Sequence, residues 1–247
     1  MTGIAQQHGT VGDLVRRSAI CFFDCDGVLL NSNQIKIDAL SRTLSDLPDG
    51  IRRSCLDAFK SGFGLGRRDH FVRFFRIVGD EHIAMEEFVE YRSKLYANQL
   101  ADAYSFASLA PGAHEMASLL KLTRKDALVV TAGLASEAIR ALSNCAIEDS
   151  FQAITGTPDR KADVMREWLA RVHVKSQEAV MFGDALADAD AALEAGIPFV
   201  FVHGLSLVGQ STVRQRFVDC GASFFTISDI TPNRSLVDGI YESTEKC

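Results

Sequence analysis

The sequence predicts an α/β protein with a doubly wound parallel sheet and an inserted helical domain. Two observations favour this fold class. Short apolar segments alternate with longer amphipathic segments along most of the chain, and residues 33–108 interrupt that alternation with helical patterns and no convincing strand. The chain has 247 residues, of which 47% are hydrophobic, so it can bury a full core and is long for one compact domain.

The apolar segments are typical of strands buried on both faces of a parallel sheet. They cover residues 19–24, 127–131, 179–182, 198–202 and, more weakly, 223–227. Between them, apolar residues recur every three or four positions, which predicts helices over residues 112–122, 135–145, 161–172, 185–195 and 211–220. We therefore expect residues 1–32 and 109–247 to form the core domain, with residues 1–18 as a tail or a short helix.

Residues 33–108 are expected to form a separate helical domain. Phe71, Phe74 and Phe75 lie close to helical spacing within residues 68–78, and residues 83–100 carry apolar side chains on one face. The glycines of residues 62–66 predict a flexible turn between helices. The α/β pattern then resumes at Pro111 and Gly112.

Composition excludes several classes of function. The net charge is −6 and no long basic run is present, so nucleic acid is not an expected partner. No window is apolar for long enough to span a bilayer, so no membrane association is expected. The six cysteines are scattered without a C-x-x-C pair, which disfavours a disulfide framework or a zinc site and favours the reducing cytoplasm.

Polar residues follow three of the predicted strands at the point where each strand ends. Asp24 and Asp26 follow the first strand, Thr131 ends the second, and Asp184 and Asp188 follow the third. Ligands of open α/β sheets bind beyond the carboxyl ends of the strands, so these side chains are expected to meet at one site. Carboxylates that meet repel one another unless a cation holds them, and hard oxygen ligands select Mg²⁺.

Four short motifs follow the predicted strands in order. They are D-x-D-G-V at residues 24–28, Thr131 at a strand end, the basic residue Lys161, and G-D-x-x-x-D at residues 183–188. This set resembles the haloacid dehalogenase-like hydrolase superfamily over nearly the whole chain. The chain is similar to the phosphatase branch with a helical cap between the first and second motifs, which includes phosphoglycolate phosphatases and β-phosphoglucomutases.

The resemblance implies a mechanism of phosphoryl transfer. Asp24 would attack phosphorus and form an aspartyl-phosphate, while Asp26 would act first as general acid and then as general base. Thr131 and Lys161 would bind the non-bridging phosphate oxygens, together with the chain at Ala132 and Gly133.

The resemblance also implies the ligands of Mg²⁺. They would be the carboxylate of Asp24, the main-chain carbonyl of Asp26 and the carboxylate of Asp184, and Asp188 would either join the metal site or orient Lys161. Expectation from the residues alone is weaker, because acidic side chains also suit the first turn of a helix.

Gly64, Arg67 and Arg68 in the predicted cap are candidates for contacts with the substrate. Each assignment also has a simpler alternative. Judged alone, Arg67 and Arg68 are typical surface charges, Asp24 could be a turn or capping residue, and Lys161 could be a solvated helix lysine.

The sequence therefore predicts a Mg²⁺-dependent phosphatase that hydrolyses a small phosphorylated metabolite, such as a sugar phosphate or a compound like phosphoglycolate. Dehalogenation is disfavoured, because dehalogenases lack a proton-transferring Asp at the position of Asp26. Two alternatives stay open: a phosphomutase of the β-phosphoglucomutase type, and a binding or regulatory protein that keeps the fold without turnover.

Overall fold

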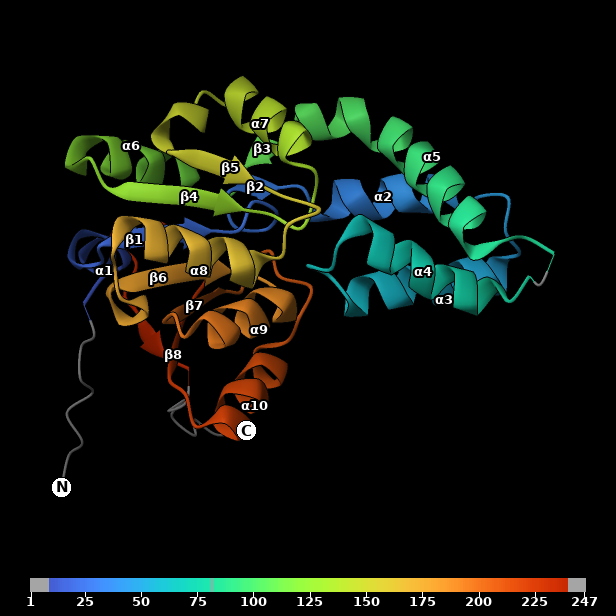
Figure 1. Ribbon diagram of the computed structural model, residues 1–247. Helices are drawn as coiled ribbons and strands as arrows, with labels where there is room; N and C mark the ends of the chain where they lie inside the picture. The colour runs from blue at the N-terminus through green and yellow to red at the C-terminus, as the bar shows by residue number, and fades with distance from the viewer. Residues whose placement is uncertain (1–8, 81, 240–247) are drawn as a thin grey trace, which may run out of the picture.

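The computed structural model describes residues 9–80 and 82–239 (Figure 1). Seven strands form one sheet in the order β5-β4-β1-β6-β7-β8-β9. They are β1 (Ile20–Phe23), β4 (Asp126–Val130), β5 (Ala153–Thr155), β6 (Ala179–Gly183), β7 (Phe199–Val202), β8 (Phe224–Ile227) and β9 (Val237–Asp238). All neighbours pair in parallel except β8 and β9, which are antiparallel. The predicted fold class, a mostly parallel α/β sheet with connecting helices, is confirmed.

Helices cover both faces of the sheet, because successive side chains of a strand point to opposite faces. Cys21 and Phe23 pack on the face covered by α1 (Val11–Arg17), α6 (Ala113–Thr123) and α7 (Ala135–Asn144). Ile20 and Phe22 pack on the other face, which α8 (Lys161–Val172), α9 (Leu186–Ala195) and α10 (Gln210–Cys220) cover. The two apolar layers explain why the strands read as uninterrupted apolar segments.

Four helices lie together beyond the carboxyl edge of the sheet, and we call them the helical lobe (Figure 1). They are α2 (Asn33–Thr43), α3 (Asp49–Ser61), α4 (Arg67–Val78) and α5 (Met85–Ser105). The chain enters the lobe after β2 (Leu30–Asn31) and leaves it before β3 (Ser108–Leu109), and these two short strands pair antiparallel.

Aromatic side chains hold the helical lobe together. The ring of Phe71 contacts Phe74 and Tyr96 edge to face, with centroids 5.4 and 6.0 Å apart. Edge-to-face pairs add to the free energy gained by burying the rings. The same apolar cluster continues into the first face of the sheet, so the lobe and the core share one packed interior.

Several elements differ from the sequence prediction at their ends. Helix α5 runs to Ser105, five residues beyond its predicted end, and β5, β2 and β3 were not predicted because each has only two or three residues. The predicted tail or short helix before the sheet contains helix α1, while residues 1–8 and 240–247 of the predicted core domain lie outside the described residues. None of the described helices is long and apolar enough to cross a membrane.

Candidate active site

The candidate site lies at the carboxyl ends of three neighbouring strands. Strand β1 lies between β4 and β6 in the sheet, so the residues that follow these strands meet at one edge. Asp24 follows β1, Thr131 follows β4 and Asp184 follows β6, and each of these side chains is buried. The sheet order therefore brings together the residues that the sequence placed at strand ends.

Lys161 connects two carboxylates of the site. Its Nζ donates to Oδ1 of Asp24 at 2.7 Å and to Oδ1 of Asp188 at 2.5 Å. Lys161 is the first residue of α8, and its side chain is 7% exposed. Oδ2 of Asp188 accepts a hydrogen bond from the main-chain N–H of Ala185, so both of its oxygens have protein partners. This geometry does not fit a solvated helix lysine.

Burial and mutual repulsion raise the pKa values of the site carboxyls. Burial raises the pKa of Asp24 to about 7, with a further contribution from Asp188 that Lys161 opposes. The pKa of Asp184 lies well above its ordinary value, because Asp184 is buried beside Asp24 and Asp188. Burial alone would lower the pKa of Lys161, but Asp188 and Asp24 outweigh it and the pKa is raised. The site therefore carries more negative charge than its one lysine balances.

Three of these carboxylates fit a divalent cation. Asp24, Asp184 and Asp188 each offer an oxygen within 4.8 Å of the other two. Oδ1 of Asp184 is buried and has no hydrogen-bond partner, which is costly unless a ligand occupies the position. An all-oxygen donor set suits Mg²⁺. Asp26 was predicted to bind the metal through its main-chain carbonyl, so the hydrogen bonds of its carboxylate leave that prediction untouched.

The carboxylate of Asp26 is held by two residues at the start of the helical lobe. Ser32 donates from Oγ to Oδ1 of Asp26 at 2.5 Å, and Nζ of Lys36 donates to Oδ2. Burial alone would raise the pKa of Asp26, but Lys36 and Ser32 outweigh it and the pKa is lowered. Nζ of Lys36 also lies 5.8 Å from the ring centroid of Phe63 and 5.6 Å from that of Tyr104. Asp26 is therefore ionised and fixed in orientation.

The loop after β4 is closed by its own hydrogen bonds. Thr131 accepts from the main-chain N–H of Gly133 through Oγ1 at 3.0 Å. Thr157 donates from Oγ1 to the main-chain oxygen of Ala132 at 2.7 Å. Ala132 and Gly133 line a cavity together with Asp24. The predicted phosphate-binding segment thus faces the same space as the predicted nucleophile.

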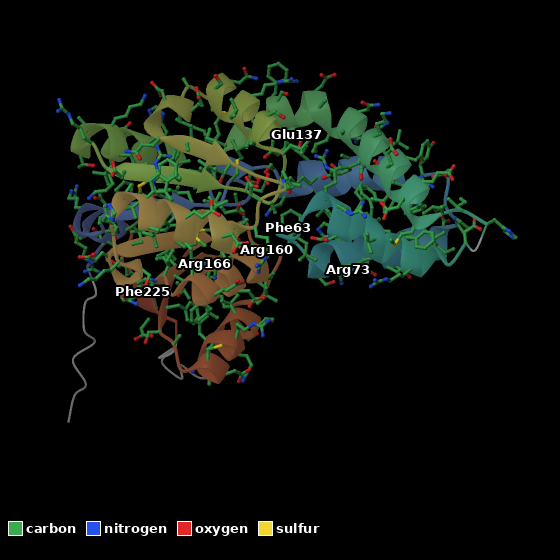
Figure 2. The ribbon with its side chains drawn as sticks, viewed as in Figure 1. Phe63, Arg73, Glu137, Arg160, Arg166 and Phe225 are labelled. Carbon is green, nitrogen blue, oxygen red and sulfur yellow. The ribbon has the colours of Figure 1, made fainter. Side chains whose placement is uncertain are left out.

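The helical lobe closes this cavity from the opposite side. Its lining there includes Phe59, Phe63, His70 and Tyr96, and Figure 2 shows Phe63 between the sheet and helices α3 and α4. The cavity is therefore aromatic on the side of the lobe and charged on the side of the sheet, and such a lining suits a polar molecule.

The three predicted lobe residues have different surroundings. Gly64 has φ +90°, and a Cβ there would lie 2.9 Å from the Cβ atoms of Ala185 and Ala187. Nη2 of Arg67 donates to both carboxylate oxygens of Glu137, at 2.9 and 2.7 Å, and Arg67 lines the cavity.

Arg68 points away from the cavity. It pairs with Glu86 within the lobe, and the two side chains are 57% and 64% exposed. The structure therefore brings Gly64 and Arg67, but not Arg68, to the wall that faces Asp24.

Comparison with known families gives the identity of this arrangement. The sequence profile of the haloacid dehalogenase-like hydrolases matches residues 21–202, which is most of the chain. The chain belongs to this family. The matched segment begins within β1 and ends with β7, so it contains all four motifs and the helical lobe.

Solved structures similar to this hydrolase share its fold at low sequence identity. A predicted phosphatase from Clostridium acetobutylicum is 19% identical, with a TM-score of 0.67 over 85% of this chain and 94% of the other. A predicted phosphoglycolate phosphatase from Haemophilus somnus is 18% identical, with a TM-score of 0.62 over 76% and 86%. A β-phosphoglucomutase from Clostridium difficile is 17% identical, with a TM-score of 0.65 over 87% and 92%. The search of curated proteins finds no match.

Sequence reasoning missed three residues that touch the site of this hydrolase. Ser32 and Lys36 contact Asp26, and Asn33 donates from Nδ2 to Oδ2 of Asp184 at 3.0 Å. The signal available for two of them was spacing, because Ser32 and Lys36 are four residues apart and share a helix face. A single lysine in an amphipathic helix is nevertheless typical of a solvated side chain, so this signal was weak.

Proposed function

We propose that this hydrolase is a Mg²⁺-dependent phosphatase that acts on a small phosphorylated metabolite through an aspartyl-phosphate intermediate. The observation that carries the proposal is the group at the carboxyl end of β1. There Asp24 is hydrogen-bonded to Lys161, lies near Asp184 and Asp188, and lines the cavity between the sheet and the helical lobe. Asp24 supplies a nucleophilic carboxylate, Lys161 a buried positive charge, and the three aspartates a candidate metal site. Phosphoryl transfer requires these groups of a protein.

In the first step, Asp24 attacks phosphorus and the bond to the leaving oxygen breaks. Lys161 and the loop at Thr131, Ala132 and Gly133 bind the non-bridging oxygens, where negative charge resides in the transition state. Asp26 gives a proton to the leaving oxygen, and because Lys36 and Ser32 hold it ionised in the structure, it must first take up that proton from solvent. Asp24, Asp184 and the main-chain oxygen of Asp26 would hold Mg²⁺, which would supply charge neutralisation for the transferred phosphoryl group.

In the second step, water hydrolyses the aspartyl-phosphate at Asp24. Asp26 takes the proton from this water, which requires the ionised form that Lys36 and Ser32 favour. The product is inorganic phosphate, and the carboxylate of Asp24 is regenerated. Asp188 keeps Lys161 in place through the 2.5 Å hydrogen bond.

We further propose that residues 33–108 act as a cap domain over a core formed by residues 1–32 and 109–247. The support is the position of the helical lobe at the carboxyl edge of the sheet, where Gly64 and Arg67 reach core residues. A cap excludes water and selects the leaving group. We place the enzyme in the reducing cytoplasm, as expected for a protein whose described cysteines are free thiols.

A phosphomutase is the second candidate, and the aromatic side chains of the lobe that line the cavity beside Asp24 favour it. Transfer of the phosphoryl group from Asp24 back to a sugar hydroxyl requires that water be kept from the intermediate. The similar fold of a β-phosphoglucomutase agrees with this possibility. Product analysis separates the two, because a phosphatase releases inorganic phosphate and a mutase returns an isomeric sugar phosphate.

The decisive experiment is hydrolysis of an aryl phosphate with and without Mg²⁺ by the wild type and by Asp24→Asn. We expect Mg²⁺-dependent release of phosphate that Asp24→Asn abolishes. Asp102→Asn, an exposed position on α5, is the matched control and should keep the wild-type rate. If folded wild type releases no phosphate from this substrate or from a panel of phosphorylated metabolites, the phosphatase proposal fails and a mutase or binding role takes its place.

A further inference from the structure

Asn33, the first residue of the helical lobe, is tied to the core. Its side chain is buried, and Nδ2 donates to Oδ2 of Asp184 at 3.0 Å and to the main-chain oxygen of Leu205 at 2.8 Å. Both amide protons are therefore used. The reversed amide would place its oxygen against two acceptors, so the hydrogen-bond pattern defines the orientation of the side chain.

Two oxygens beside this hydrogen bond have no partner among the described residues. They are Oδ1 of Asn33 and Oδ1 of Asp184, and both are buried. Leaving a buried oxygen unpaired costs about 1–3 kcal/mol, more for a charged group. Two such oxygens on side chains that are bonded to each other indicate that a ligand with its water shell belongs at this position.

The surrounding chain is shaped to hold Asp184 in one orientation. A Cβ on Gly27, which has φ +76°, would lie 2.0 Å from Oδ2 of Asp184 and 2.9 Å from Nδ2 of Asn33. The missing side chain thus makes room for the hydrogen bond. Ser206 donates from Oγ to the main-chain oxygen of Asp184 on the other side. Of the two carboxylate oxygens, Oδ1 is left for a cation.

We propose that Asn33 is a positioning residue for the metal ligand Asp184. By holding Oδ2, it presents Oδ1 to Mg²⁺ and thereby sets the affinity for the ion. The inference rests on the proposed function, because it assumes the Mg²⁺ site there. Since Asn33 is the first residue of α2, its hydrogen bond to Asp184 joins the first turn of the lobe to the metal site.

The test is calorimetric titration of metal-stripped protein with Mg²⁺, without substrate. Residues that orient a metal ligand typically contribute about 10- to 100-fold to metal affinity, so we expect Asn33→Ala and Asn33→Ser to weaken the dissociation constant by that factor. Asn31→Ala, an exposed asparagine two residues earlier, is the control and should bind as the wild type does. At saturating Mg²⁺, the kcat of the Asn33 variants on the aryl phosphate should return to the wild-type value.

Each other outcome overturns the proposal in a recognisable way. Thermal unfolding in EDTA checks that the variants fold. If Asn33→Ala does not fold, Asn33→Ser is used in its place. Wild-type affinity in a folded Asn33 variant would overturn the role of Asn33 and leave the proposed function standing, as would a kcat that stays low at saturating Mg²⁺. Absence of Mg²⁺ binding by the wild type would overturn both proposals.

Discussion

At the scale of single residues, two buried lysines neutralise carboxylates of the candidate site. Lys161 balances the carboxylates on the metal side of the cavity, and Lys36 balances Asp26 on the side of the leaving group. A buried ion pair adds little net stability, but removing one partner leaves an uncompensated charge. Loss of either lysine should therefore cost more stability than loss of a surface lysine.

Replacement of Lys36 by Met should impair both folding and turnover. Removing one partner of a buried pair costs about 3–5 kcal/mol, so we expect a loss near 3 kcal/mol at pH 8. The loss should shrink towards pH 5, because Asp26 without Lys36 takes up a proton. The kcat should fall about 10²-fold, as for loss of general acid–base function. Urea unfolding at both pH values and steady-state kinetics measure these effects, with the exposed Lys94→Met as control. Equal stability of the two variants would contradict the prediction.

His70 should make the protein less stable in mild acid. Burial, aided by Arg73 and Lys36, lowers the pKa of His70 to about 3. The unfolded chain binds this proton near pH 6.5 and the folded protein does not, so stability falls as the pH decreases through 6.5. Between pH 7 and pH 5 this group alone should cost about 2 kcal/mol.

The check is the same urea unfolding on His70→Phe, which keeps an aromatic ring against Phe59. The variant should lose about 2 kcal/mol less than the wild type between pH 7 and pH 5. An identical pH dependence in the two proteins would show that His70 is not buried in its neutral form.

The sequence alone could assign to the site those residues that directly follow a predicted strand. Asp24, Thr131 and Asp184 follow apolar segments, and the carboxyl edge of a parallel sheet brings such positions together. Lys36 and Asn33 could not be placed in this way. They lie on a helix of the inserted lobe, and their position over the site depends on how that lobe packs on the core.

At the scale of secondary-structure elements, the loop before α4 and the first residue of that helix both reach the core. Gly64 lies against Ala185 and Ala187 at the start of α9, and Arg67 binds Glu137 of α7 with both carboxylate oxygens. Because the pair of Arg67 and Glu137 is partly buried, it is stronger than the exposed pair of Arg68 and Glu86. The segment from Gly64 to Arg67 thus contacts helices on both faces of the sheet.

Replacing Gly64 by Ala should prevent the close approach of this loop. The added Cβ would meet two other Cβ atoms at 2.9 Å, so the lobe must shift away from α9. We expect kcat/KM on a small phosphorylated substrate to fall about tenfold or more, since displacements near 1 Å at such sites are costly.

Gly79→Ala is the matched control for Gly64→Ala. Gly79 has φ +65°, so alanine there carries similar backbone strain, but no described residue lies within 4 Å of the added Cβ. Both variants should lose about 1 kcal/mol of stability from the positive φ, and only Gly64→Ala should lose activity. Comparable kinetics in the two variants would mean that the loop does not need this close approach.

Elements were predictable in proportion to their length and periodicity. The long helices and four-residue apolar strands were found, but β5 has three residues and is a half-buried edge strand. Its importance is tertiary, because the main-chain oxygen of Thr155 accepts from the N–H of Thr131 and aligns the loop at the site. Short edge strands lack the apolar pattern that identifies buried ones.

At the scale of the whole molecule, the excess of negative charge at the sheet edge should make stability depend on Mg²⁺. A ligand that binds only the folded state adds about 2.7 kcal/mol at 100 times its dissociation constant. For a chain of this size we expect a rise in Tm of about 5–10 °C. Differential scanning calorimetry with Mg²⁺ and with EDTA checks this, and Asp184→Asn should abolish most of the rise. A Tm independent of Mg²⁺ would argue against the metal site.

The fold as a whole was predictable because strands and helices have different periodicities of apolar residues in the sequence. Alternation of apolar strands and amphipathic helices identifies the sheet, and its interruption identifies the lobe. How the lobe packs on the sheet could not be predicted. It depends on Gly64 meeting Ala185 and on the hydrogen bonds of Asn33, which join residues more than a hundred positions apart.

The pairing of β2 with β3 has an evolutionary consequence. Because Leu30 pairs with Leu109 and Asn31 with Ser108, the two points where the chain enters and leaves the lobe are adjacent. An insertion whose ends meet can be exchanged for another while the strands on either side of it keep their pairing. Descendants of such a chain could acquire new specificity by replacing the helical lobe, while the edge of the sheet that carries the candidate site stays under separate selection.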